Sequence, residues 1–229
     1  MNKNPIKALF FDLDHTLWDF EKNSALTFKQ LFTTFDINLS LDDFLAVYIP
    51  NNNAYWKLYR EGKIEKEAMR YERLKSVFNT LNYKATDALI DNLADAYIQG
   101  LPKYNALFNG AIDVLAALKL RYSLHIITNG FKEVQHLKMR NSGLLPFFET
   151  ITDSSSVGTK KPDPTIFNHA LKVAQVHPHQ ALMIGDSLEA DIEGALNVGM
   201  QAVHFTPVAE CNPAHYHEIT QLQQLLQIL

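Results

Sequence analysis

Apolar residues along the chain follow two different patterns. In the first, short apolar runs end abruptly in small or polar residues, at positions 7–11, 123–127, 181–184 and 201–205. Runs of this length that are apolar on both faces are typical of parallel strands covered by helices. Segments with helical spacing lie between them, at 111–120, 131–140, 164–174 and 188–198. The alternation predicts βαβ units and therefore a doubly wound α/β fold with a parallel sheet.

The second pattern fills residues 20–104, where apolar positions recur at helical spacing and no strand-like run occurs. A segment of about 80 residues is too long for a simple connection between two strands. We therefore expect two domains, an α/β core of residues 1–19 and 105–229 and an inserted all-helical cap of residues 20–104. Because both ends of the insert return to the sheet, we expect the cap to lie over the strand ends.

Composition narrows the class of protein. The chain is 47% hydrophobic and 20% charged, which is typical of a globular protein with a sizeable core. The net charge of −4 argues against a nucleic-acid polymer as partner. The apolar run at 6–11 is too short for a signal peptide or a membrane span, so we expect a cytoplasmic protein without membrane association. Cys211 stands alone, which excludes an intramolecular disulfide.

Polar residues follow the apolar runs at the place where ligands bind in open α/β sheets, beyond the carboxyl ends of the strands. These residues are Asp12, Asp14, Thr16, Thr128, Asn129, Asp186, Ser187 and Asp191, with Lys160 and Lys161 ahead of the helix expected from residue 164. Several carboxylates around one point repel one another, so a bound cation is expected, and hard oxygen ligands indicate Mg²⁺. A lysine and backbone N–H groups opposite it would complete a phosphate cradle.

Four stretches of sequence carry a resemblance to a known family. They are Asp-Leu-Asp-His-Thr-Leu at 12–17, Thr-Asn-Gly at 128–130, Lys-Pro-Asp-Pro at 161–164, and Gly-Asp-Ser at 185–187 followed by Asp191. In their order, their spacing and their position at the ends of predicted strands, they resemble the four motifs of the haloacid dehalogenase-like hydrolase superfamily. A lone Asp-x-Asp pair is common by chance, whereas four motifs in this order are not.

The resemblance implies a phosphatase that works through an aspartyl phosphate. Asp12 would be the nucleophile, and Asp14 would protonate the leaving oxygen and then activate water. Members of the superfamily that cleave carbon–halogen bonds lack an aspartate two residues after the nucleophile. The presence of Asp14 therefore favours phosphate chemistry over dehalogenation.

The resemblance also implies the residues that bind phosphate and metal. Thr128, Asn129 and Lys161 would hold the phosphoryl oxygens. The expected Mg²⁺ ligands are Asp12, Asp186 and the backbone carbonyl of Asp14. Asp191 would orient Lys161 or a metal-bound water.

Several positions keep a second interpretation. Lys160 competes with Lys161 for the phosphate, although the position before the proline matches the motif. Asp191 could be an exposed helix residue, and Asp186 and Ser187 could cap the helix that follows. His15 departs from the glycine that is most common after the second aspartate. A structural or substrate-gating role is expected for it, with a catalytic role as the alternative.

Specificity is expected to come from the cap. At helical spacing Tyr48, Asn52 and Trp56 share one face, and Asn52 and Trp56 are candidate substrate contacts. The alternative is that Tyr48 and Trp56 belong to the core of the cap. Trp18 and Phe20 lie on the segment that leads into the cap and are candidates for lining the cleft.

Within the superfamily, the run at 14–20 with Asn23 and Thr128-Asn129-Gly130 resembles the branch of house-cleaning pyrimidine 5′-nucleotidases. This resemblance implies a small-molecule substrate, a nucleoside 5′-monophosphate. A sugar-phosphate, phosphoglycolate or N-acylneuraminate 9-phosphate phosphatase would share the same core. A non-catalytic phosphate-binding module is disfavoured because no catalytic position is missing. The sequence leaves the oligomeric state open.

Overall fold

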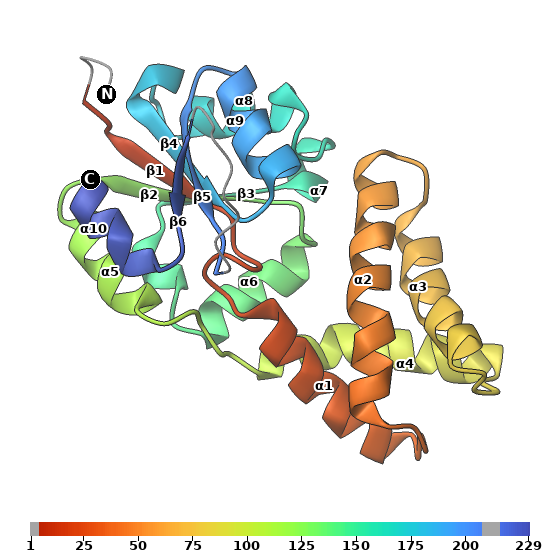
Figure 1. The fold of residues 1–229 in the computed structure, drawn as a ribbon. Coiled ribbons are helices and arrows are strands. Elements are labelled where there is room, and N and C mark those ends of the chain that lie inside the picture. The colour runs from red at the N-terminus through yellow and green to blue at the C-terminus, as the bar shows by residue number, and fades with distance from the viewer. Residues whose placement is uncertain (1–4, 208–215) are drawn as a thin grey trace. The chain divides into compact units, whose positions relative to one another are not determined.

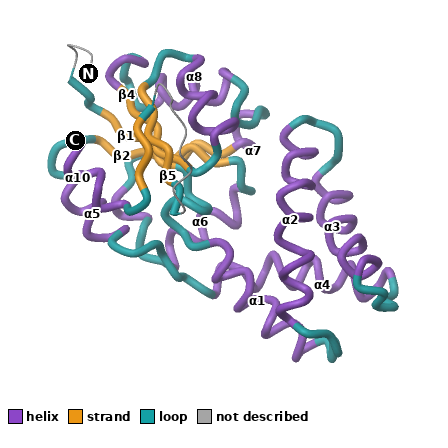
Figure 2. The backbone as a smooth tube through the Cα atoms, in the orientation of Figure 1, coloured by secondary structure: helices purple, strands orange, loops and turns teal. Residues whose placement is uncertain are grey.

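A computed structural model describes residues 5–207 and 216–229, so Cys211 lies outside the described residues. The chain divides into two compact units. One comprises Met1–Asp19 and Asn105–Leu229, and the other comprises Phe20–Tyr104. The first unit holds the sheet and the second is helical (Figures 1 and 2).

A six-stranded parallel sheet forms the centre of the first unit, with the strand order β3-β2-β1-β4-β5-β6. Its strands are β1 (Ala8–Phe11), β2 (Ser123–Thr128), β3 (Thr150–Asp153), β4 (Ala181–Gly185), β5 (Gln201–Phe205) and β6 (His217–Ile219). All four residues of β1 are buried, as expected for a central strand covered on both faces. The doubly wound α/β fold predicted from the sequence is confirmed.

Helices cover both faces of this sheet, with α5 and α10 on one face and α8 and α9 on the other (Figure 1). The helices of this unit are α5 (Ala111–Lys119), α6 (Lys132–Asn141), α7 (Ser154–Val157), α8 (Pro164–Val173), α9 (Gly194–Asn197) and α10 (Leu225–Ile228). Phe10 and Met183 of the sheet pack with Ile166 and Phe167 of α8 in one buried cluster. This packing fixes the strand ends that carry the polar residues, because close-packed interiors tolerate little displacement.

The second unit has four α-helices, followed by a 3₁₀ turn at Leu101–Lys103. They are α1 (Phe20–Thr34), α2 (Leu41–Arg60), α3 (Lys66–Thr80) and α4 (Asp87–Gly100). Ser40 and Thr86 begin α2 and α4 as N-caps, each accepting a backbone N–H with its hydroxyl. An aromatic cluster fills the interior. The ring of Phe28 lies 4.6 Å from those of Tyr48 and Tyr97, centroid to centroid. The unit therefore has an apolar core of its own.

Some elements differ from the sequence-based expectation. The strands β3 and β6 were not predicted, because each is very short and lacks a long apolar run. Beyond β6 the chain forms a 3₁₀ turn, Leu222–Gln224, and the short helix α10. The helix expected over 188–198 is a π-helix, Leu188–Glu193, followed by α9.

Within the described part of the chain, no helix is both long enough and apolar enough to cross a membrane.

Candidate active site

Three neighbouring strands bring the predicted site residues to one edge of the sheet. In register, Phe11 of β1 lies opposite Ile126 of β2 and Ile184 of β4. Asp12 therefore follows β1 at the level where β2 and β4 also end, and its backbone N–H donates to the Ile184 carbonyl at 2.9 Å. The chain turns to opposite sides of the sheet around β1, which is where open α/β sheets bind ligands.

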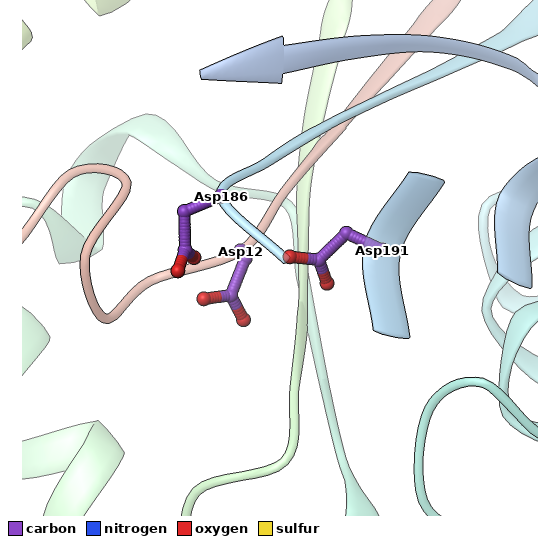
Figure 3. Close-up of side chains that lie close together, drawn as sticks. All are labelled: Asp12, Asp186 and Asp191. Atoms are coloured by element: carbon purple, nitrogen blue, oxygen red, sulfur yellow. The ribbon is translucent and has the colours of Figure 1, made fainter. Parts of the chain in front are cut away.

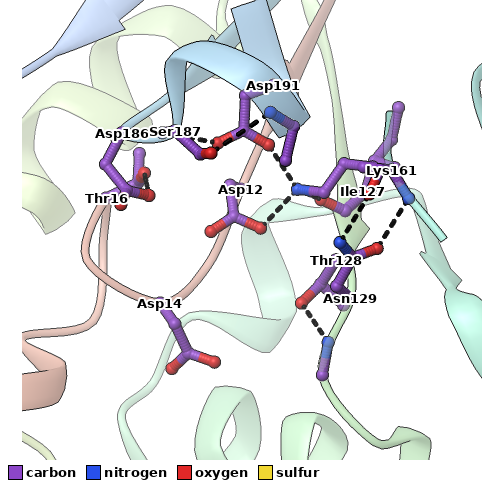
Figure 4. A network of polar contacts seen from close by, with 12 residues as sticks. Asp12, Asp14, Thr16, Ile127, Thr128, Asn129, Lys161, Asp186, Ser187 and Asp191 are labelled. Atoms are coloured by element: carbon purple, nitrogen blue, oxygen red, sulfur yellow. Dashed lines mark hydrogen bonds and ion pairs between the residues drawn. The ribbon is translucent and has the colours of Figure 1, made fainter. Parts of the chain in front are cut away.

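Lys161 is the cation at the centre of this edge (Figure 4). Its Nζ lies 2.6 Å from Asp12 Oδ1 and 2.6 Å from Asp191 Oδ1, and it donates to the Ile127 carbonyl at 2.7 Å. The side chain is only 2% exposed. Of the two candidate lysines, Lys161 is thus the one whose ammonium reaches Asp12. Asp191 is buried beside it, so the alternative of an exposed helix residue is wrong.

Burial and charge shift the pKa values of these groups. Burial raises the pKa of Asp12 well above its usual value, against the opposing charge of Lys161. Burial alone would lower the pKa of Lys161, but Asp12 and Asp191 outweigh it and raise this pKa above the usual lysine value. Burial, followed by the charge of Asp191, raises the pKa of Asp186 to about 7. Lys161 therefore stays cationic. The neighbouring carboxylates repel one another, which disfavours their charged forms.

The carboxylates of Asp12, Asp186 and Asp191 form a cluster whose candidate ligand oxygens all lie within 4.8 Å of one another (Figure 3). Burial is the largest cause of the raised pKa values of Asp12 and Asp186, and the neighbouring carboxylates raise them further, so the charged forms of both groups are disfavoured. A hard divalent cation would compensate their charges, and carboxylate oxygens are the ligands that Mg²⁺ prefers. Both oxygens of Asp191 are already engaged, Oδ1 by Lys161 and Oδ2 by the Ser187 N–H, whereas Lys161 contacts Asp12 through Oδ1 alone. Asp12 and Asp186 are therefore the carboxylates best suited to hold the ion.

The loop after β4 is shaped around Asp191. The Ser187 N–H donates to Asp191 Oδ2 at 3.0 Å, and the Ser187 hydroxyl accepts the Ala190 N–H at 3.2 Å. Ser187 is thus the N-cap of the π-helix, a type of helix found often at functional sites. A Cβ at Gly185 would lie 2.3 Å from Asp191 Oδ2, so only glycine permits this approach.

Asn129 and Thr128 have well-defined partners. The Asn129 side chain donates to the Lys161 carbonyl at 3.0 Å and accepts the Lys161 N–H at 2.8 Å. This side chain therefore fixes the backbone that carries Lys161, a role not expected from the sequence. The Thr128 hydroxyl accepts the Gly130 N–H at 3.1 Å and an N–H of Gln135 at 2.8 Å.

Asp14 lies on the loop after β1 and is held by two residues that the sequence reasoning missed. Gln135 Nε2 donates to Asp14 Oδ2 at 2.9 Å, and Lys138 Nζ donates to Asp14 Oδ1 at 2.7 Å. Both partners are buried polar residues of α6. His15, next in the loop, adopts φ 61°, a left-handed conformation that explains why glycine suits this position. Thr16 donates to Asp186 Oδ1 at 3.2 Å.

The candidate cap residues lie on α2. The Asn52 side chain is buried within the helical unit, where its Oδ1 accepts from the Tyr48 hydroxyl at 3.3 Å and from Arg73 Nη1 at 2.9 Å. Tyr48 belongs to the aromatic core, in agreement with the alternative interpretation of this residue. Trp56 is half-buried, and its ring lies 5.7 Å from that of Tyr59. A contact of Asn52 or Trp56 with a substrate stays a prediction.

Comparison with known proteins agrees with this arrangement. The sequence model of the haloacid dehalogenase-like hydrolases matches residues 6–199. The chain belongs to this family. The HAD-hydrolase YfnB from Bacillus subtilis is 33% identical over 97% of this chain and 95% of its own. A crystal structure of YfnB bound to magnesium superposes with a TM-score of 0.89 and covers 99% of both chains.

Two further relatives of this hydrolase carry the names of phosphatases. Pyrimidine 5′-nucleotidase PynA from Streptococcus pneumoniae is 31% identical over 97% of this chain and 90% of its own. Glyceraldehyde 3-phosphate phosphatase from Pyrococcus furiosus is 35% identical over 98% of this chain and 93% of its own. The chain is therefore an enzyme of the hydrolase family, and its relatives include phosphatases with different substrates.

Proposed function

We propose that this hydrolase is a Mg²⁺-dependent phosphomonoesterase that acts through an aspartyl phosphate, with a nucleoside 5′-monophosphate as its substrate. The observation that carries the proposal is the position of Asp12, whose carboxylate follows the central strand and contacts the buried ammonium of Lys161. The fold and family membership support the same chemistry, because the named phosphatases among the relatives share them.

In the first step, an oxygen of Asp12 attacks the phosphorus atom and forms a P–O bond. The bond from phosphorus to the leaving oxygen breaks, its electron pair stays on that oxygen, and Asp14 supplies the proton. Lys161 and the hydroxyl of Thr128 donate hydrogen bonds to phosphoryl oxygens. Lys161 can remain charged throughout, because Asp12 and Asp191 raise its pKa.

In the second step, Asp14 is a carboxylate and takes a proton from water. The water oxygen bonds to phosphorus, the bond to Asp12 breaks, and its electron pair restores the Asp12 carboxylate. Inorganic phosphate is released. When bound, Mg²⁺ would supply positive charge beside Asp12 and Asp186 and so favour the approach of an anionic phosphoryl group.

The nucleotide assignment rests on the resemblance to PynA, which covers almost all of the chain. Trp56, a half-buried aromatic residue of the helical unit, is our candidate for stacking on a base. A triose phosphate is the second candidate substrate, because glyceraldehyde 3-phosphate phosphatase is related over the same length at similar identity. Both candidates share the phosphoryl chemistry and differ in what lies beyond the ester oxygen.

A panel of phosphomonoesters tests the proposal. Phosphate release is measured for nucleoside 5′-monophosphates, glyceraldehyde 3-phosphate and p-nitrophenyl phosphate, with Mg²⁺ and with EDTA. We expect hydrolysis that requires Mg²⁺ and the highest kcat/KM with a nucleotide. Preference for the triose phosphate would move the substrate assignment to the second candidate. Full activity in EDTA would show that the carboxylate cluster has been misinterpreted.

A further inference from the structure

We infer that Gln135 and Lys138 of α6 are positioning residues that hold the carboxylate of Asp14 for its acid–base work. The inference rests on the proposed role of Asp14. Neither residue lies in the four motifs. Gln135 donates hydrogen bonds to Asp14 and Thr128, and Lys138 donates one to Asp14. Lys138 also lies within electrostatic range of Asp12. We therefore assign their effect on the reaction chiefly to Asp14 and Thr128.

The two side chains reach Asp14 from one face of the helix. Residues three positions apart lie side by side on an α-helix, so Gln135 and Lys138 point the same way. Each oxygen of Asp14 has its own donor, at 2.9 Å from Gln135 and 2.7 Å from Lys138. A carboxylate with a separate donor on each oxygen cannot rotate about its Cβ–Cγ bond without breaking both bonds. The direction of the Asp14 carboxylate is thereby fixed.

Gln135 also connects Asp14 to the phosphate-binding hydroxyl of Thr128. Its Nε2 donates to both residues, and the hydroxyl accepts a second bond from the Gly130 N–H. A hydroxyl has two acceptor sites and one hydrogen, so with both acceptor sites filled its hydrogen is directed outward as a donor. A phosphoryl oxygen is the acceptor that the proposed reaction would provide. One amide thus orients the acid–base group and a phosphate donor together.

The residues around the Gln135 amide and the Lys138 ammonium leave these side chains little room to move. A Cβ at Gly130 would lie 2.4 Å from the amide nitrogen of Gln135, so the amide packs directly against the glycine backbone. The Lys138 side chain is 3% exposed, and its Nζ lies 4.3 Å from the ring centroid of Trp18. A cation this deeply buried is costly unless paired, and Asp14 and the Trp18 ring both offset that cost.

A purely structural ion pair and a positioning pair differ in a measurable way. Replacing a buried pair member with an apolar residue of similar size changes packing and stability, and it affects every substrate equally. Loss of Asp14 positioning affects the step in which a proton must be delivered. An alkoxide leaving group needs that proton, whereas p-nitrophenolate is stable without it. The two kinds of ester therefore separate the interpretations.

The experiment uses Gln135→Ala and Lys138→Met, with Lys132→Met as the matched control on the exposed face of the same helix. Rapid-quench measurement of the first step compares p-nitrophenyl phosphate with an alkyl phosphate that the wild-type enzyme hydrolyses. We expect the alkyl-ester rate to fall about tenfold or more and the p-nitrophenyl rate to change less than about threefold. Steady-state turnover of both esters should fall, because the second step needs Asp14 as a base. Lys132→Met should match wild type.

A double-mutant cycle completes the test. In an Asp14→Asn background, adding Lys138→Met should cause little further loss, since residues that act through one group are not additive. Equal losses of the first-step rate for both esters, together with a lower melting temperature, would overturn the inference in favour of packing. If Gln135→Ala and Lys138→Met keep wild-type rates while Asp14→Asn is inactive, the positioning inference is overturned and the proposed role of Asp14 stands. Wild-type turnover in Asp14→Asn would instead overturn the proposed role of Asp14.

Discussion

At the scale of residues, charge compensation around Asp12 determines what the site can do. Lys161 contacts two carboxylates, Asp12 and Asp191. Among side-chain hydrogen bonds between described residues, the Asp186 carboxylate accepts only that of the neutral Thr16 hydroxyl. The ammonium therefore neutralises one side of the cluster. The uncompensated charge at Asp186 is what makes a divalent cation fit.

Asp186 gives a prediction for the dependence of stability on pH. Its folded-state pKa of about 7 exceeds the ordinary value of 3.8, so the folded protein binds the proton more tightly than the unfolded chain. This contribution to stability is complete below pH about 4 and is lost as the pH rises through about 7. In EDTA, Asp186→Asn should therefore gain stability relative to wild type between pH 4 and pH 7. Thermal melts across this range check it, and a difference that does not vary with pH would contradict it.

Residues in motifs could be predicted from the sequence, but their partners could not. Asp12, Lys161 and Asp191 were expected together because each follows a strand or matches a motif. Gln135 and Lys138 were missed because a polar residue on a helix is ordinarily solvated, and only the fold shows that this face is buried. The role of Asn129 in holding the Lys161 backbone likewise depends on tertiary contact between distant segments.

At the scale of elements, the close approach of the π-helix to β4 places Asp191 against Lys161. Gly185→Ala should push Asp191 away, because the new Cβ would lie 2.3 Å from its carboxylate. We expect a loss of stability of about 1–3 kcal/mol, as is usual for overpacking, together with lower kcat. Gly158→Ala is the control for an added methyl, because a Cβ there would meet nothing within 4 Å, although its φ of 82° adds backbone strain. Wild-type kcat in Gly185→Ala would contradict this account of the loop.

Apolar runs predicted β1, β2, β4 and β5, because a buried parallel strand must be apolar on both faces. They did not predict β3 and β6, whose stability comes from pairing with a neighbouring strand rather than from their own pattern. The π-helix was read as an ordinary helix, since apolar spacing over six residues does not distinguish the two.

At the scale of the whole molecule, the helical unit is compact and has a polar network in its own core. Arg73 is buried, and Asn52 is the acceptor for its Nη1. Asn52→Ala should lower the stability of this unit by about 1.5–3 kcal/mol, the usual loss for a hydrogen bond to a charged group. Asn53→Ala, an exposed neighbour on the same helix, should have little effect. Thermal unfolding of both variants measures the difference, and equal stability would contradict the role given to Asn52.

The central claim for the molecule is that Asp12 carries the phosphoryl group. Asp14→Asn should slow the second step, so the intermediate should accumulate when this variant is mixed with p-nitrophenyl phosphate and Mg²⁺. The measurement is acid quenching, peptic digestion and mass spectrometry of the peptides. We predict a phosphoryl group on Asp12, absent when Asp12→Asn is combined with Asp14→Asn. A phosphoryl group on any other residue, or rapid turnover by Asp12→Asn alone, would contradict the account.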